Sequence, residues 1–206
     1  MKVLTLKTGY MAANAYIVYT ENKPEAVIID PGDDIELIMD LIKEHELKLE
    51  KILLTHGHFD HIGAVKDLKE RTGAQVAIHK QEADFLTDPN KNLSYIINRQ
   101  IVQDPADIFL EDGDLIRVAD MEFKVLHTPG HTEGGVCYKL GKVLFTGDTL
   151  FEGSVGRTDL SGGSYEQLMS SIREKLLVLD DDHLVYPGHG RQTTIGRERR
   201  ENPFLA

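Results

Sequence analysis

The chain of 206 residues contains a single cysteine, Cys137, so it cannot form an internal disulfide. Its first residues, MKVLTLKTGYMAANAY, lack the continuous apolar stretch of a secretory signal or of a membrane-spanning helix. These two absences predict a soluble cytoplasmic protein with no membrane partner. Cys137 lies in an apolar stretch between Val136 and Tyr138, which predicts a buried side chain rather than a nucleophile.

Basic residues are also scarce. The 23 Lys and Arg are outnumbered by 34 Asp and Glu, which gives a formal charge of −11 and argues against nucleic acid as a partner. Hydrophobic residues make up 41% and charged residues 28%, which is typical of a soluble protein with a sizeable core. We find no repeat, linker or low-complexity tract, so we expect one domain over residues 1–206 that acts on a small molecule.

Hydrophobic patterning predicts an α+β protein. Apolar residues at helical spacing predict helices over 35–47, 63–71 and 165–177, with caps at Asp33 or Asp34 and near Ser164. Residues 80–112 are largely irregular apart from a short helix near 82–86. Several strand ends lead into loops that carry His or Asp, and helices separate the groups of strands, which favours two packed sheets with helices outside. The predicted strands are 3–7, 15–20, 26–30, 51–55, 75–79, 115–118, 122–126, 135–140, 142–145 and 183–186.

The densest cluster of chemically active residues is THGHFDH, residues 55–61, at the end of an apolar strand. It places His56, His58, Asp60 and His61 within six positions. In a loop, residues two apart can face one point, and Asp60 and His61 can face a second point nearby. Imidazole and carboxylate ligands suit zinc, iron or manganese. Three histidines and an aspartate at this spacing are poorly explained as a polar loop.

Three further candidate ligands lie, like this motif, in a loop that directly follows a predicted strand. His131 lies in TPGHT, Asp148 in TGDTLF and His189 in PGHG, and each follows a glycine in a loop after a predicted strand. A lone residue of this kind is usually structural. Because all seven candidates share one position in the topology, we expect them to converge at one edge of the sheets.

Together these motifs resemble those of the metallo-β-lactamase superfamily, and most closely its hydroxyacylglutathione hydrolase (glyoxalase II) group. The resemblance spans positions 55–190. It implies a four-layer αββα sandwich of two mixed β-sheets with a two-metal site at one edge. By motif, His56, His58 and His131 would hold one divalent ion, Asp60, His61 and His189 the other, and Asp148 would bridge them. Zinc is the expected metal, with iron or manganese also compatible.

The resemblance implies a metal-dependent hydrolase that cleaves a thioester such as S-lactoylglutathione with a hydroxide bridging the two metals. Asp60 and Asp148 would be the catalytic carboxylates, Asp60 by orienting the hydroxide as well as binding metal. Phe151, Arg157 and Arg191 are candidates for contact with an anionic substrate. An ion pair between Arg157 and Asp159 is the more favoured role for Arg157. The arginines 191, 197, 199 and 200 form the one basic cluster, and they would either attract that substrate or form a solvated helix face.

The chain departs from full-length glyoxalase II in one respect. Only sixteen residues follow Gly190, so we expect it to lack the extra helical C-terminal domain that supplies much of the glutathione contact in that group. Three alternatives stay open: a mononuclear iron dioxygenase acting on a persulfide, a hydrolase of another ester or a lactone, and a non-catalytic member of the fold. The two-zinc β-lactamases usually place Cys where Asp148 stands, which disfavours that branch. The oligomeric state has no signature in the sequence.

Overall fold

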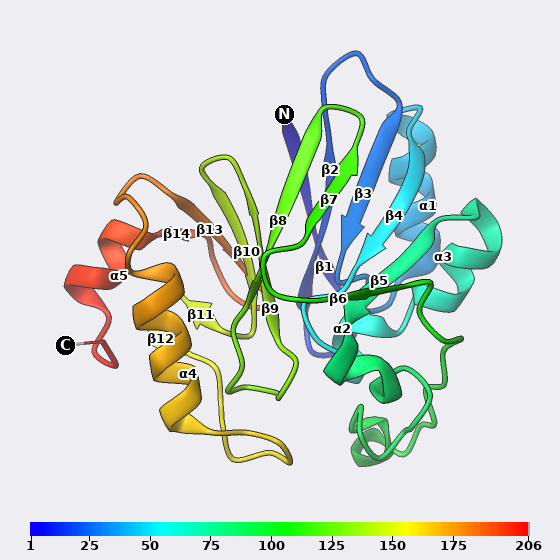
Figure 1. Ribbon diagram of the computed structural model, residues 1–206. Coiled ribbons are helices and arrows are strands. Elements are labelled where there is room, and N and C mark those ends of the chain that lie inside the picture. Colours follow the sequence, from blue (N-terminus) through cyan, green and yellow to red (C-terminus); the bar gives the residue numbers. More distant parts are fainter. Residues whose placement is uncertain (206) are drawn as a thin grey trace.

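The computed structural model describes residues 1–205 as two six-stranded sheets packed face to face, with helices on both outer sides (Figure 1). The first sheet is built from the N-terminal half, and its strands stand in sequence order. Its first two pairings are antiparallel and the other three are parallel, so the sheet is mixed. Its strands are β1 (Lys2–Thr8), β2 (Ala13–Tyr19), β3 (Glu25–Ile29), β4 (Lys48–Leu53), β5 (Gln75–His79) and β6 (Ile108–Leu110).

The second sheet is also mixed, with strand order β14-β13-β10-β9-β8-β7 and one parallel pair, β10 with β13. A two-residue turn at Gly141 and Lys142 joins β9 to β10. The strands are β7 (Leu115–Val118), β8 (Met121–His127), β9 (Val136–Leu140), β10 (Val143–Gly147), β13 (Leu184–Pro187) and β14 (Thr193–Thr194), and a separate small hairpin pairs β11 (Leu150–Phe151) with β12 (Ser154–Val155).

The longer helices form the two outer layers. Helices α1 (Ile35–Glu44) and α3 (Val65–Thr72) cover the first sheet, whereas α4 (Tyr165–Ser171) and α5 (Ile195–Glu201) lie against the second (Figure 1). The remaining helical segments are α2 (Phe59–Ile62), two 3₁₀ turns, η1 (Lys80–Phe85) and η2 (Ser94–Ile97), and a π-helical turn, η3 (Ile172–Leu176). No helix among residues 1–205 is long and apolar enough to cross a membrane.

Alternating side chains of the strands separate three hydrophobic clusters. In β2, Tyr16 and Val18 join the cluster between the sheets, while Ala15 and Ile17 face α1 and α3. Cys137 points the other way from Tyr138 and packs with Leu168 and the other buried residues beneath α4. It is fully buried, as predicted, and burial raises the pKa of its thiol to about 11. The four layers confirm the predicted αββα architecture.

Helix boundaries differ from the prediction in two places. The helix predicted over 63–71 corresponds to α3, which begins at Val65, and a further short helix that was not predicted, α2, begins within the histidine motif at Phe59. Asp34 precedes α1 but does not cap it, since its backbone is left-handed and its carboxylate accepts a hydrogen bond from Gly9 N. Ser164 does cap α4, and the predicted helix continues beyond Ser171 as the π-helical turn.

Candidate metal centre

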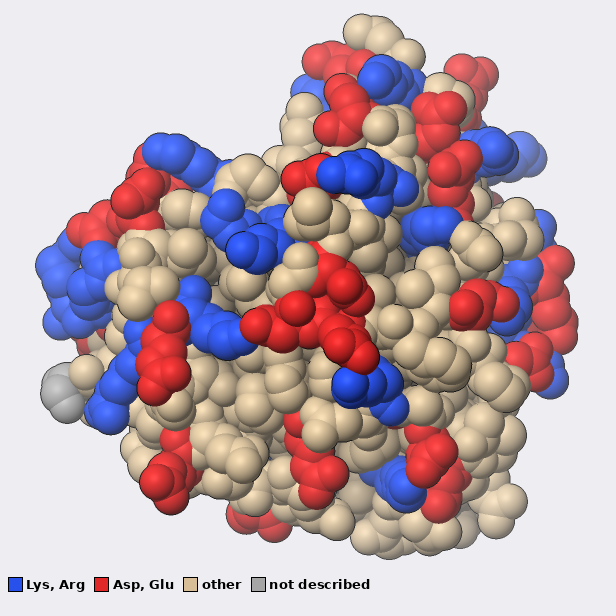
Figure 2. Space-filling model, viewed as in Figure 1, with Lys and Arg blue, Asp and Glu red and all other residues tan. Residues whose placement is uncertain are grey.

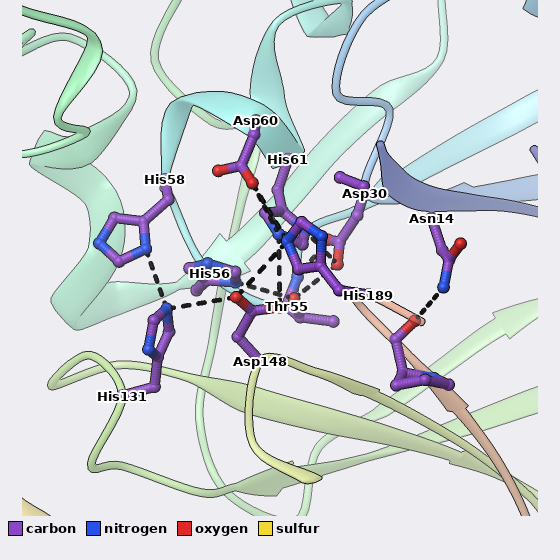
Figure 3. Close-up of polar contacts among 12 residues, drawn as sticks. Asn14, Asp30, Thr55, His56, His58, Asp60, His61, His131, Asp148 and His189 are labelled. Carbon is purple, nitrogen blue, oxygen red and sulfur yellow. Dashed lines mark hydrogen bonds and ion pairs between the residues drawn. The ribbon is translucent and has the colours of Figure 1, made fainter. Parts of the chain in front are cut away.

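All seven predicted ligand residues lie at one edge of the sandwich, where loops leave strands of both sheets (Figure 3). Strand β4 leads into the loop with His56 and His58, and α2 carries Asp60 and His61. The other three follow strands of the second sheet, with His131 after β8, Asp148 after β10 and His189 after β13. The convergence expected from the sequence is therefore present in the structure.

The first group consists of His56, His58 and His131. One ring nitrogen of each lies within 4.8 Å of the others, and all three side chains are buried. The Nδ1 atom of His58 lies 3.0 Å from Nε2 of His131. Three imidazole nitrogens directed at one point are a typical ligand set for zinc or iron.

The second group consists of Asp60, His61 and His189, whose ligand atoms also lie within 4.8 Å of one another. Asp60 Oδ2 is 3.2 Å from His189 Nε2 and 3.7 Å from His61 Nε2. A carboxylate and two imidazoles form a second set that suits a divalent cation.

Asp148 lies between these groups. Its Oδ2 is 3.7 Å from His131 Nε2 in the first group and 3.7 Å from His189 Nε2 in the second. Its Oδ1 is 3.5 Å from His61 Nε2. A single carboxylate in this position can contact two neighbouring cations at once.

Three buried atoms of this cluster have no hydrogen-bond partner: His56 Nε2, His61 Nε2 and Asp148 Oδ1. Unpaired buried polar atoms are rare in native proteins and costly to stability. Cations bound among them would satisfy all three, so the residues present fit a metal centre.

Hydrogen bonds on the opposite ring nitrogens orient three of the histidines. The Nδ1 atom of His61 donates to Asp30 Oδ2 at 3.1 Å, and that of His131 donates to the backbone oxygen of Arg157 at 2.8 Å. His56 Nδ1 lies 3.1 Å from Thr55 Oγ1. A proton on each Nδ1 leaves the lone pair on Nε2, which faces the cluster.

Burial and neighbouring charges set the protonation of these histidines. Burial, with the adjacent imidazoles, holds the pKa of His56 well below its ordinary value and lowers the pKa of His58 to about 3. Both rings are therefore neutral at pH 7 and able to bind metal. Burial alone would lower the pKa of His61, but Asp60 and Asp148 outweigh it and raise this pKa to about 10. A cation between these carboxylates would replace that proton.

Asp30, at the end of β3, is a buried residue whose role the sequence did not reveal. Its carboxylate accepts hydrogen bonds from Thr55 N at 2.7 Å, from Thr55 Oγ1 at 2.6 Å and from His61 Nδ1. It thus fixes both the start of the histidine motif and the orientation of His61. The only sequence signal is an aspartate that ends an apolar strand, just before Pro31 and Gly32.

Glu82 is a second buried acid that the sequence did not single out. It is fully buried in η1 and accepts hydrogen bonds from Gly57 N at 3.0 Å and Gly134 N at 2.9 Å. Gly57 separates His56 from His58, and Gly134 lies three residues after His131. One side chain therefore connects the two loops that form the first group. Burial raises the pKa of this carboxyl group.

The conformation of the loop after β13 is held by hydrogen bonds to the first sheet and requires a glycine at position 188. Asn14 of β2 donates from Nδ2 to Pro187 O at 2.9 Å, and its backbone N donates to Gly188 O at 2.7 Å (Figure 3). A Cβ atom on Gly188 would lie 2.2 Å from Asp148 Oδ1. The glycine before His189 is thus required by the close approach of Asp148.

The three predicted substrate residues occupy different surroundings. Phe151 and Arg157 line a cleft beside the metal centre, whereas Arg191 is exposed and is not among the residues that line it. The guanidinium of Arg157 donates to both carboxylate oxygens of Asp159, at 2.7 and 2.8 Å, so the ion pair expected from the sequence is present.

The basic cluster in the C-terminal segment is largely paired with acids. Arg197 contacts Glu152 and Glu201, and both Arg199 and Arg200 contact Asp181. Figure 2 shows these basic side chains over α5 beside acidic ones. These pairs favour a solvated helix face over an anion-attracting surface.

Several known proteins are similar to this chain in sequence or in structure. GloC of Haemophilus influenzae, named a hydroxyacylglutathione hydrolase, is 41% identical over 196 residues, which cover 93% of this chain and 92% of GloC. The structure of the BLEG-1 B3 metallo-beta-lactamase superposes with a TM-score of 0.96 at 42% identity, over 100% of both chains.

Two further solved structures are similar. TTHA1623, crystallised in a di-iron-bound form, gives a TM-score of 0.87 at 39% identity over 98% of this chain and 100% of its own. ETHE1 from Myxococcus xanthus gives 0.82 at 34% identity over 98% of this chain and 84% of its own. The sequence model of the metallo-beta-lactamase superfamily matches residues 8–189, so the chain belongs to that superfamily.

Proposed function

We propose that this protein is a binuclear metal-dependent hydrolase of thioesters, with S-lactoylglutathione or a related hydroxyacyl thioester as substrate. The observation that carries the proposal is the position of Asp148 between two groups of ligand atoms, each suited to one divalent cation. The name of GloC as a hydroxyacylglutathione hydrolase supports the choice of substrate.

In this proposal His56, His58 and His131 hold one cation, Asp60, His61 and His189 hold the other, and Asp148 contacts both. When bound, divalent cations supply Lewis acidity, which lowers the pKa of water and polarises an acyl carbonyl. Zinc is the metal we expect, although this ligand set also accepts iron and manganese.

The carboxylate of Asp60 has a second role in the proposal. Its side chain is 14% exposed and lines the cleft, so it can accept a hydrogen bond from the attacking water and orient it. The pKa of Asp60 is held well below its usual range because His61 and His189 outweigh the effect of burial, so this group is ionised. A thiolate is a good leaving group, and the reaction therefore needs no strong general acid.

A mononuclear iron dioxygenase is the main alternative, and it would need only the first group and Asp148. The convergence of Asp60 and His189 on His61 favours a second metal instead. Hydrolysis of a lactone or of a simple ester is a further alternative. Hydrolysis of a β-lactam is included because the similar structure BLEG-1 is named a B3 metallo-beta-lactamase.

One experiment separates these functions. The metal content of the purified protein is measured on the same sample that is tested with S-lactoylglutathione, other thioesters, a lactone, a simple ester, a β-lactam and glutathione persulfide. We expect two divalent ions per chain and the highest kcat/KM with a thioester. One iron per chain with oxygen uptake on the persulfide would exclude the hydrolase.

Removal of the metals should abolish activity and lower stability. We expect a chelator to lower the melting temperature by several degrees, because bound metal stabilises the folded state and its removal leaves buried polar atoms unpaired. Added zinc or manganese should restore both properties. If the chelator changed neither the melting temperature nor the activity, the proposed metal centre would be contradicted.

A further inference from the structure

A cleft of about 480 Å³ lies directly beside the metal centre and is lined by fourteen residues. Five of them are proposed metal ligands and one is Arg157. The other eight are apolar, and they include Met11, Ile96, Ile97, Phe151, Val155 and Leu160. Ordinary ligand sites combine apolar walls with a few polar groups that fix orientation, and here nearly all the polar groups belong to the metal centre.

One wall is formed by isoleucines that are exposed on a firmly held segment. Ile96 is 59% and Ile97 is 36% exposed, although both belong to the short turn η2. Asn92, fully buried before this turn, donates to Phe85 O and Ile101 O, both at 2.9 Å. Its own backbone oxygen accepts from the N–H of Phe59, at the start of α2. The segment therefore presents two apolar side chains to solvent in a fixed position next to the histidine motif.

A second part of the lining, the β11–β12 hairpin with Phe151 and Val155, is also held by partly buried hydrogen bonds. The buried carboxylate of Glu198 in α5 accepts from Gly153 N at 2.8 Å, and Asn202 Nδ2 donates to Ser154 O at 3.0 Å. The aromatic ring of Phe151 lies 6.3 Å from the ring of His189, measured between centroids. Two anchored apolar walls thus flank the site of the reaction.

The surroundings offer little to an anionic substrate. The charge of Arg157 is matched by its two contacts with Asp159. A neighbouring hollow, which shares Asp60 with the cleft, is lined by Arg99 and by the acidic residues Asp33 and Asp34. The guanidinium of Arg99 lies 3.9 Å from the carboxylate of Asp33. With Asp60, three carboxylates and one guanidinium line this hollow, so among the thioesters proposed above those with a less anionic thiol suit it better than S-lactoylglutathione.

We propose, resting on the thioesterase function above, that the substrate carries an apolar chain of several carbons on one side of the reacting thioester group, and that this chain lies along Ile96, Ile97 and Phe151. The chain belongs either to the acyl group or to the thiol. Each methylene that leaves water should increase binding about fourfold until the cleft is filled.

The test uses two series of substrates with the wild-type enzyme. In the first, acetyl, butanoyl and hexanoyl thioesters share the neutral thiol N-acetylcysteamine. In the second, the acyl group is constant and the thiol is ethanethiol, butanethiol or hexanethiol. We expect kcat/KM to rise about fourfold per methylene in one of the two series, which identifies the side of the chain. A flat or falling kcat/KM in both series overturns the inference.

Variants of η2 provide the control. Ile96→Ser together with Ile97→Ser should lower kcat/KM for the longest substrate of the responsive series at least about tenfold, and for the shortest less than about twofold. Tyr95→Ser changes a residue of the same turn that is 55% exposed and does not line the cleft, and it should leave the chain-length dependence intact. An equal loss with both sets of variants would contradict the assignment.

Binding of S-alkyl thioethers of N-acetylcysteamine, measured by calorimetry, separates this inference from the proposed function. If no thioester is hydrolysed but the dissociation constant still falls with chain length, the hydrolase proposal fails and the apolar cleft stands. If hydrolysis occurs but neither binding nor kcat/KM depends on chain length, only the inference about the chain fails.

Discussion

Asp148→Asn is expected to lower kcat/KM for a thioester at least about a thousandfold. The carboxylate lies within 3.7 Å of ring nitrogens of His131, His61 and His189, so it links the two halves of the centre. Asparagine has nearly the same shape but no charge, so the fold should persist while the affinity for at least one cation falls. Kinetics and metal analysis on the same sample measure both effects.

Asp159→Asn is the matched control for that variant. Asp159 lies eleven residues further along the same loop region and is exposed, and its contacts are with Arg157 rather than with the metal centre. The backbone oxygen of Arg157, which orients His131, is unchanged by this substitution. We expect a loss of less than about tenfold in the control. An Asp148→Asn enzyme that kept a tenth of its activity and both metals would contradict the role of Asp148.

Glu82→Ala should lower the stability of the protein strongly, although Glu82 is not one of the proposed metal ligands. The substitution leaves the buried N–H groups of Gly57 and Gly134 without an acceptor, and each such group costs about 1–3 kcal/mol. We therefore expect the free energy of unfolding to fall by about 2–6 kcal/mol. Because the same bonds hold the loops of His56, His58 and His131, the affinity for one cation should fall about 10- to 100-fold.

Urea unfolding of the metal-free protein and metal titration separate these two effects. Glu82→Gln keeps one side-chain oxygen and should lie between the wild type and Glu82→Ala. Glu70→Ala, an exposed position on α3, is the control and should change stability by less than about 0.5 kcal/mol. A Glu82→Ala protein as stable as that control would show that the two loops hold their positions without Glu82.

The layered fold was predictable because its central strands are nearly continuous apolar runs. Ala15 and Ile17 on one face of β2 and Tyr16 and Val18 on the other carry the signal of a strand buried on both sides. The short strands β6, β11, β12 and β14 were not predicted. They contain two or three residues each, too few for a periodic pattern.

The convergence of the seven proposed ligand residues was predictable because their motifs are dense and each follows a strand. Asp30 and Glu82 were missed for the opposite reason. Glu82 binds backbone groups 25 and 52 residues away, so nothing in its own neighbourhood reveals its partners. The exposed position of Ile96 and Ile97 was not predictable either. It depends on Leu93 and Asn98, two non-glycine residues in left-handed conformation that flank the turn.

Anomalous X-ray diffraction from crystals of the metal-loaded protein tests the two-cation centre most directly. Data collected above and below the absorption edge of the bound metal locate each ion independently of any assumed ligand. We predict two peaks, one in contact with His56, His58 and His131 and one in contact with Asp60, His61 and His189, with Asp148 between them. A single peak, or a pair of peaks away from these side chains, would contradict the account.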